Sequence, residues 1–311
     1  MREVIARLIE AEGEAKRIVQ EAESEADTCA TFQRWLAASL IAELCELTAG
    51  LSGSARRLLE WMAVRHQLEN LKVLLRGILS RTPLDALRRH LVDVPAELSL
   101  DEPAVMASST WWEAASRLGQ SPFAPWVART FACHGAQPQP LLVEAKLDQS
   151  YFQELVTRAD ALPPADRVLV APIVHQEVDV YHLALAARGK FHYGLGANVL
   201  AALHVGGTGI SERRYRAMLA EVGLFAALGH GVGRVLDRIP TSPPAAADYP
   251  VATSPPALDA LAWTRYLRLA NRAFRRSHMG PTAVVGYVAI RRVEAITHRC
   301  RAQEGHHGST V

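Results

Sequence analysis

The polar residues with the most regular spacing fall within one predicted helix. Arg65, Glu69, Lys72 and Arg76 follow one another at intervals of four, three and four residues, which places them on one helix face. Opposite charges at these intervals attract one another along a helix. The spacing therefore indicates charges that support one another along the helix, and it offers no reactive group.

Other candidate reactive groups lack the arrangement that their chemistry requires. Glu177 and Asp179 are two residues apart, so on a helix their carboxylates diverge and are poorly placed for paired acid–base work. The segment Gly229–Arg234 is rich in glycine but lacks the Lys-Ser/Thr ending of a phosphate-binding loop, which favours a helix end or close helix packing. The histidines and four cysteines show no metal-ligand spacing. We predict no catalytic residue, no cofactor and no metal site, and thus a protein that is not an enzyme.

Composition excludes further classes of function. The chain has 311 residues, 49% of them hydrophobic and 21% charged, which is typical of a folded globular protein. Its net charge is only +2, so nothing in the overall charge points to a nucleic-acid partner. No window offers about 18 uninterrupted apolar residues, so we expect no bilayer span.

The elements that position these polar residues recur along the chain. A helical signature ending in Arg-Gly occupies residues 65–77 and again 177–189, and a weaker copy occupies 290–301. Arg76 and Arg188 are 112 positions apart, and Arg188 and Arg301 are 113 apart. Because a repeated supersecondary unit indicates a fold built by stacking copies, the repeat favours a scaffold over a single catalytic cleft.

The segments that flank the signatures repeat as well. Short helices are predicted over 83–90 and 101–108 after the first copy, and around 196–203 and from Ser211 after the second. Aromatic-rich helices precede the second and third copies, and Asp148 and Asp259 are candidates to cap or polarise their starts. Little of the chain alternates with period two, so we predict an all-α fold.

The N-terminal segment and the tryptophans leave alternatives open. Residues 2–27 carry apolar residues at alternating intervals of four and three, which fits either a coiled-coil seam or a solvated helix on its own domain. Trp111, Trp112 and Trp126 are either core residues or, if exposed, a docking patch. The expected units are a helix over 1–30, repeats over 31–103, 104–207 and 208–304, a Pro/Ala/Ser linker over 239–257, and a flexible tail over 305–311.

Five segments in order resemble one family. They are Arg65–Arg76 with its Leu-Glu-Asn-Leu-Lys core, Val143–Phe152, Glu177–Asp179, the Val205–Gly207 turn, and Gly286–Val288 leading to Val293–Ile296. Together they are similar to the C subunit of archaeal and bacterial V-type (A-type) ATPases, which is also the family of the eukaryotic V-ATPase membrane-sector subunit d. The resemblance runs from about residue 32 to 304.

The resemblance implies a fold and a role. It implies three similar helical bundles in a pseudo-threefold funnel on the cytoplasmic face of a membrane. The implied partners are the proteolipid c/K-type ring and the D/F-type subunits of the central shaft, and the implied role is a non-catalytic connector that transmits torque. The family-signature polar residues, which would brace helices or face the shaft, are Arg65, Glu69, Asn70, Arg76, Glu177, Asp179, Arg188 and Glu294.

The chain also departs from the family pattern. Residues 7–22 are similar to the coiled-coil start of a peripheral-stalk G/H-type subunit, which makes an E/G-type stalk subunit a further candidate partner through residues 2–27. Tyr181-His182 stands where the family has Glu-Asn, and Ala289-Ile290 where it often has Lys-Glu. The alternative function is therefore a helical adaptor that binds stalk-like coiled coils and does not couple rotation.

Overall fold

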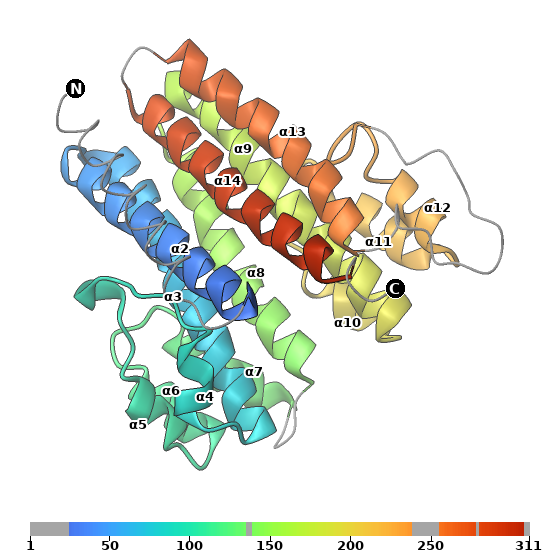
Figure 1. Ribbon diagram of the computed structural model, residues 1–311. Coiled ribbons are helices and arrows are strands. Elements are labelled where there is room, and N and C mark those ends of the chain that lie inside the picture. Colours follow the sequence, from blue (N-terminus) through green and yellow to red (C-terminus); the bar gives the residue numbers. More distant parts are fainter. Residues whose placement is uncertain (1–24, 135–138, 238–254, 278–279, 308–311) are drawn as a thin grey trace.

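Six long helices dominate the computed structural model, which describes residues 25–134, 139–237, 255–277 and 280–307 (Figure 1). Within these ranges no strand occurs, which confirms the prediction of an all-α fold. The long helices are α2 (Glu25–Ala49), α3 (Gly53–Ser80), α8 (Pro140–Asp160), α9 (Pro164–Ala184), α13 (Pro255–Arg276) and α14 (Pro281–His307).

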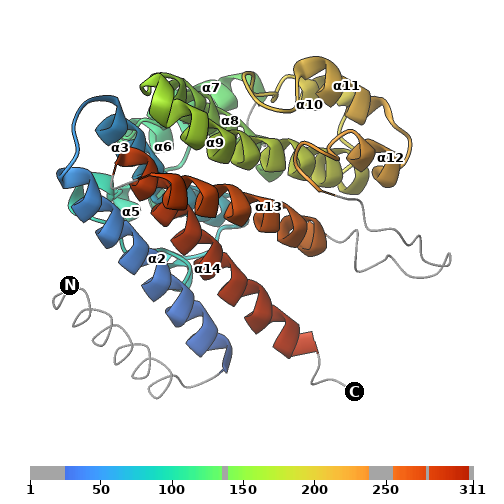
Figure 2. The same cartoon turned by 90° about the horizontal axis from the view of Figure 1, so that it is seen from above.

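The long helices form three hairpins that close into a ring. The hairpins are α2–α3, α8–α9 and α13–α14, and one helix of each packs against the next hairpin: α3 on α8, α9 on α13, and α14 back on α2. The three hairpin turns lie at the same end of the molecule, on the left in both Figures 1 and 2. The second helix of each hairpin thus packs against the first helix of the next hairpin, and this contact occurs three times around the ring.

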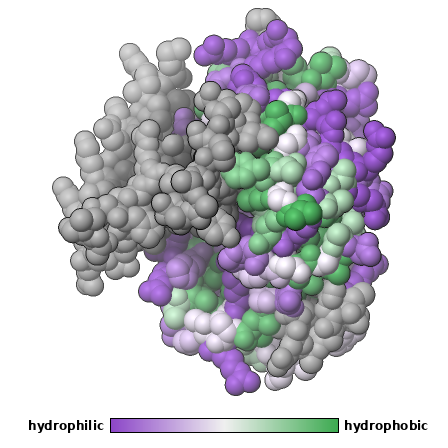
Figure 3. Space-filling model, turned by 90° about the vertical axis from the view of Figure 1, so that its right-hand side faces the viewer, coloured by the Kyte–Doolittle hydropathy of each residue, from purple (hydrophilic) through white to green (hydrophobic). Residues whose placement is uncertain are grey.

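Short helices follow the first two hairpins and pack at their far ends. Those after α3 are α4 (Leu84–Arg88), η1 (Ala96–Leu98), α5 (Glu102–Met106), α6 (Trp111–Arg117) and α7 (Ala124–His134). Those after α9 are the π-helical η2 (Leu185–His192), α10 (Ala197–Ala201), α11 (Glu212–Ala220) and α12 (Leu224–Gly229). Figure 3 shows the face of the molecule that is on the right in Figure 1, where α11 and α12 lie. Exposed large hydrophobic residues in or near these short helices include Tyr193, Val199 and Val222.

Apolar residues at helical spacing explain why α3 is the buried centre of the first hairpin. Val64, Leu68, Leu71 and Leu75 follow one another at intervals of four, three and four residues, a spacing that predicts a buried stripe; the three leucines are almost fully buried and Val64 is partly buried. The helix ends at Arg81, whose φ of 56° is left-handed and whose backbone N–H bonds back to the last turn.

One glycine in each of the first two hairpins lets a short helix approach closely. A Cβ at Gly77 on α3 would overlap Leu87 of α4, and one at Gly189 on η2 would lie 2.6 Å from Leu200 of α10. Both glycines belong to the repeated signature, so the sequence repeat corresponds to a repeated packing contact.

The structure corrects several expected boundaries and roles. Asp148 is in the middle of α8, which starts at Pro140, so it does not cap a helix start. The boundary at residue 31 falls inside α2, because 25–49 form one helix. Helix α14 continues to His307, three residues into the expected tail, and α13 starts at Pro255, within the expected linker. Residues 1–24, which include most of the predicted N-terminal helix, lie outside the described residues.

Candidate functional site

A network of buried and half-buried charges joins the first hairpin to the second. Arg65 Nη1 lies 3.1 Å and Lys72 Nζ 2.6 Å from Asp148 Oδ1, which projects from α8. Glu69 Oε1 lies 2.8 Å from Arg65 Nη2 and 3.4 Å from Lys72 Nζ. The predicted support along α3 is present, and Asp148 extends it across the seam between the two hairpins.

A second ion pair joins the second hairpin to the third within reach of the first group. Glu177 Oε1 on α9 lies 2.6 Å from Arg292 Nη1 on α14. Arg65 interacts electrostatically with both Glu177 and Arg292, so the six residues form one network of three cations and three anions. We call this set the seam network: Arg65, Glu69, Lys72, Asp148, Glu177 and Arg292.

The electrostatics of the seam network favour the charged forms of Glu69 and Arg292. Burial alone would raise the pKa of Glu69, but Arg65 and Lys72 outweigh it and lower that pKa to about 2. Burial works against the charge of Arg292 as well, and Glu177 more than compensates, so the pKa of Arg292 is raised. Each anion of the seam network lies beside a cation of the same network, and this balanced arrangement braces the helices that carry them.

Aromatic rings cover the cations of the seam network. The guanidinium of Arg65 lies 5.2 Å from the ring centre of Tyr151 and 5.3 Å from that of Phe152, and Arg292 lies 5.5 Å from that of Trp263. These distances are within the range of cation–π attraction. The aromatic residues that precede the second and third signatures in the sequence therefore pack against charged residues of the signature helices.

Two other predicted residues fix the loops that follow their helices. Asn70 on α3 donates to Val92 O (2.7 Å) and accepts from Val92 N (2.9 Å). The Asp179 carboxylate on α9 accepts from the backbone N–H groups of Gly209 (3.0 Å) and Ile210 (2.9 Å). Both residues bond main-chain groups, and this role suits a structural side chain.

His182 makes the bond in the second hairpin that corresponds to the one between Asn70 and Val92 in the first. Val205 N donates to His182 Nε2 at 3.0 Å, and Val205 follows Val92 by 113 positions. Because Nε2 accepts this bond, the imidazole is neutral with its proton on Nδ1. Burial lowers the pKa of His182 and favours this form, while the neighbouring Asp179 opposes the shift.

The remaining predicted residues form their ion pairs outside the seam network, although Arg76 also interacts electrostatically with Glu69 and Asp148. Arg76 forms a two-point pair with Glu144 of α8 at 2.5 and 2.8 Å. Glu294 pairs with Arg291 at 2.8 Å, and Arg291 also reaches Glu43 of α2 at 3.2 Å. Arg188 is exposed on η2. The structure therefore brings together three of the eight predicted residues, Arg65, Glu69 and Glu177.

Sequence reasoning did not assign three members of the seam network. The sequence predicts Asp148 as a helix-start residue and places Lys72 on a charged face of its own helix, and it indicates no role for Arg292. A signal was available for Asp148, since it lies in one of the five family-like segments. Arg292 gave none, because its pairing with Glu177 joins positions 115 residues apart.

Other features that could have carried chemistry are structural. The glycine-rich segment forms a tight turn after α12, in which Gly233 has a φ of 74° and Gly231 packs close to Leu183. Among the described residues, no group of three or more His, Cys, Asp or Glu is placed to hold a metal ion. No helix in the described part of the chain is long and apolar enough to cross a membrane. Trp112 is 71% exposed, whereas Trp126 packs partly buried against the core.

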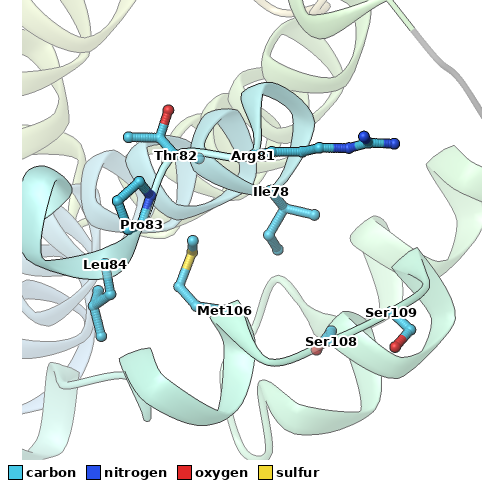
Figure 4. Close-up of a pocket in the computed structure, with 9 residues that line it drawn as sticks. Ile78, Arg81, Thr82, Pro83, Leu84, Met106, Ser108 and Ser109 are labelled. Carbon is cyan, nitrogen blue, oxygen red and sulfur yellow. The ribbon is translucent and has the colours of Figure 1, made fainter.

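A pocket of about 420 Å³ opens at the C-terminal end of α3, beside α4 and α5. Figure 4 shows Met106 pointing toward Pro83, with Ser108 and Ser109 on the other side of the space. Arg81 is the one charged residue of its lining, so the pocket offers no converging charges for a cofactor.

The protein is thus an all-α ring of three helical hairpins, with ion pairs between neighbouring hairpins. The family model described as ATP synthase (C/AC39) subunit matches residues 3–296. The chain therefore belongs to this family of V/A-type ATPase subunits. The match includes residues 7–22, for which the sequence indicated a resemblance to a stalk subunit. Comparison with curated proteins gave no match.

Proposed function

We propose that the protein is the non-catalytic central-stalk connector of a rotary V/A-type ATPase. In this role it sits on the cytoplasmic face of the membrane, binds the proteolipid ring and receives the end of the D/F-type shaft. Family membership supports a place in such a complex. The finer assignment to ring and shaft is our inference.

The closed ring of three hairpins is the observation that carries the proposal. A connector must pass torque without shearing, so it needs stiffness distributed over many contacts. Each junction between hairpins has an ion pair: Arg65–Asp148, Glu177–Arg292 and Arg291–Glu43. Such cross-links between packed helices resist sliding of one hairpin past the next.

The same contacts support a division into three units. Helix α11 packs on α10 and η2, and α12 packs on α11 and η2, so both belong with the second hairpin, although the sequence-derived boundary at residue 207 separates them from it. We propose boundaries after α7 and after α12, which leave one hairpin in each unit.

The test is recovery of partners with the tagged full chain from native membranes, followed by mass spectrometry. We expect the proteolipid ring and the shaft subunits, with membranes from the untagged strain as the control. Recovery of E/G-type stalk subunits alone would instead support the alternative, a helical adaptor that engages the stator through residues 2–27.

A further inference from the structure

One face of α13 carries an unusual concentration of positive charge. Its arginines follow one another at intervals of three, four, three and one, so they form a single stripe along about three helical turns. No Asp or Glu occurs in residues 261–276. We call this set the arginine stripe: Arg265, Arg268, Arg272, Arg275 and Arg276.

A carboxylate already occupies one end of the arginine stripe. Asp237, which follows α12, lies 2.9 Å from Arg265 Nη1 and 2.8 Å from Arg268 Nη2. These hydrogen bonds, the one from Arg268 foremost, lower the pKa of Asp237. The structure thus shows which chemical group the arginine stripe binds.

The other end of the arginine stripe has no such partner within the described residues. Arg272, Arg275 and Arg276 are exposed, and among those residues no carboxylate pairs with them. Like charges three or four residues apart destabilise a helix. The helix dipole compensates for Arg275 and Arg276, which lie in the last turn, but not for Arg272.

We propose that the free end of the arginine stripe docks an acidic helix of another protein. Carboxylates spaced one turn apart on that helix would pair with Arg272, Arg275 and Arg276, as Asp237 pairs with Arg265 and Arg268. The guanidinium fork suits two-point binding of carboxylates. From Arg265 to Arg276 the stripe spans about 16 Å at 1.5 Å per residue, a length that matches about three turns of a partner helix.

Charge and surface chemistry favour a protein helix over an anionic lipid surface. A helix that lies on a membrane presents a broad apolar face next to its basic residues. Over residues 261–276, where the side chains of α13 are described, Phe274 is the one exposed large hydrophobic residue, and it lies beside the free end of the arginine stripe. A single aromatic residue is a small apolar anchor for a lipid surface, but it fits the edge of a helix–helix contact.

The experiment places a photo-crosslinking amino acid at residue 272 of the full chain in its native cells. The matched control places it at residue 213, where Arg213 is exposed on α11, outside the stripe. We expect residue 272 to crosslink a peptide with acidic residues at helical spacing. The crosslink should fall at least fivefold in R275Q/R276Q and should also weaken as salt is raised before irradiation.

A charge-matched double variant separates this proposal from general electrostatics. R88Q/R89Q removes two exposed arginines from α4 and its C-terminal end, and it should leave the crosslink at residue 272 unchanged. Crosslinks to lipid, an equal loss in both double variants, or no crosslink above the control would each overturn the proposal. The result is independent of the connector role, which recovery of the ring and shaft tests separately.

Discussion

Asn70 and His182 show how two side chains do one job with different sensitivity to pH. Each binds a backbone group of the loop that follows its hairpin, at Val92 and Val205 respectively. An amide keeps its acceptor at any pH, whereas imidazole loses its free lone pair when it is protonated. The loop contact made by His182 therefore depends on pH, whereas the equivalent contact made by Asn70 does not.

We predict that His182→Asn flattens the pH dependence of stability. Burial lowers the pKa of His182 below its ordinary 6.5, so the unfolded chain takes up a proton first as pH falls. The stabilisation is full above about pH 6.5 and is lost below it. The groups around His182 are Asp179, His204 and Tyr215. Urea unfolding at pH 7.5 and 5.5 should show that the free energy of unfolding falls less between these pH values in the variant than in the unmodified protein.

A second histidine, His66, also contributes to the pH dependence of stability that the urea experiment measures. Burial, assisted by Arg292, lowers the pKa of His66 to about 4, so it too destabilises the fold as pH falls below 6.5. The unmodified protein and the His182→Asn variant both keep the contribution of His66 to the pH dependence of stability. The difference between their pH dependences therefore measures the contribution of His182. Equal losses in the two proteins would contradict the prediction.

We predict that two carboxylates of the seam network differ in importance. Glu69 is 42% exposed on its side chain, so Glu69→Ala should lower stability by less than about 1 kcal/mol. Asp148 is shared by Arg65 and Lys72 and is more buried, so Asp148→Ala should cost about 2–3 kcal/mol. Thermal and urea unfolding of both variants measure this, and an unchanged melting temperature in each would rule out bracing by the seam network.

At the scale of helices, close backbone approach sets how α13 and α14 cross. A Cβ at Gly286 on α14 would lie 2.7 Å from Phe274 N and 2.9 Å from Ala270 O, both main-chain atoms of α13. Main-chain atoms of a helix cannot rotate away as a side chain end can. The crossing therefore depends on the absence of a side chain at this position.

Gly286→Ala is accordingly expected to destabilise the third hairpin by about 1–3 kcal/mol through overpacking. Gly206→Ala is the control, because a Cβ there meets no atom within 4 Å. Differential scanning fluorimetry of the two variants checks the prediction. A loss at Gly206 as large as that at Gly286 would mean that crowding at the crossing is not the cause.

Sequence patterns predicted the positions of the helices better than the contacts between them. The spacing of the charged residues from Arg65 to Arg76 indicated a helix, which is part of α3, and Gly77 and Gly189, which make matching contacts, stand at equivalent positions of the 112-residue repeat. The helices α4 (84–88) and α5 (102–106) begin and end within two residues of the predicted helices over 83–90 and 101–108. The pairing of Glu177 with Arg292 and of Arg291 with Glu43 could not be predicted, because spacing along the chain does not encode which helices meet across a ring.

For the whole molecule, the junction of α14 with α2 closes the ring. Glu43 on α2 accepts hydrogen bonds from Tyr287 Oη at 2.9 Å and from Arg291 at 3.2 and 3.3 Å. No connecting loop joins these two helices directly, unlike α2 with α3. Closure there rests on side-chain packing and on this carboxylate.

We predict that Glu43→Ala loosens this junction selectively. The loss of three charge-assisted hydrogen bonds at a half-buried site should cost about 1–2 kcal/mol. Hydrogen exchange should then speed up in both 36–49 and 281–293, while α8 and α9 keep their protection. Glu60→Ala, which breaks an exposed pair within α3, is the control and should change exchange little. Faster exchange in α8 and α9 as well would contradict a local role.

The closing contact also has a consequence for synthesis. The side chains that meet at the junction of α14 with α2 are 248 positions apart, from Glu43 to Arg291. While the ribosome makes the intervening chain, the α2 surface that α14 covers has no native partner. During translation the apolar surface of the first hairpin therefore stays uncovered until α14 has been synthesised. In this interval molecular chaperones would have apolar surface to bind.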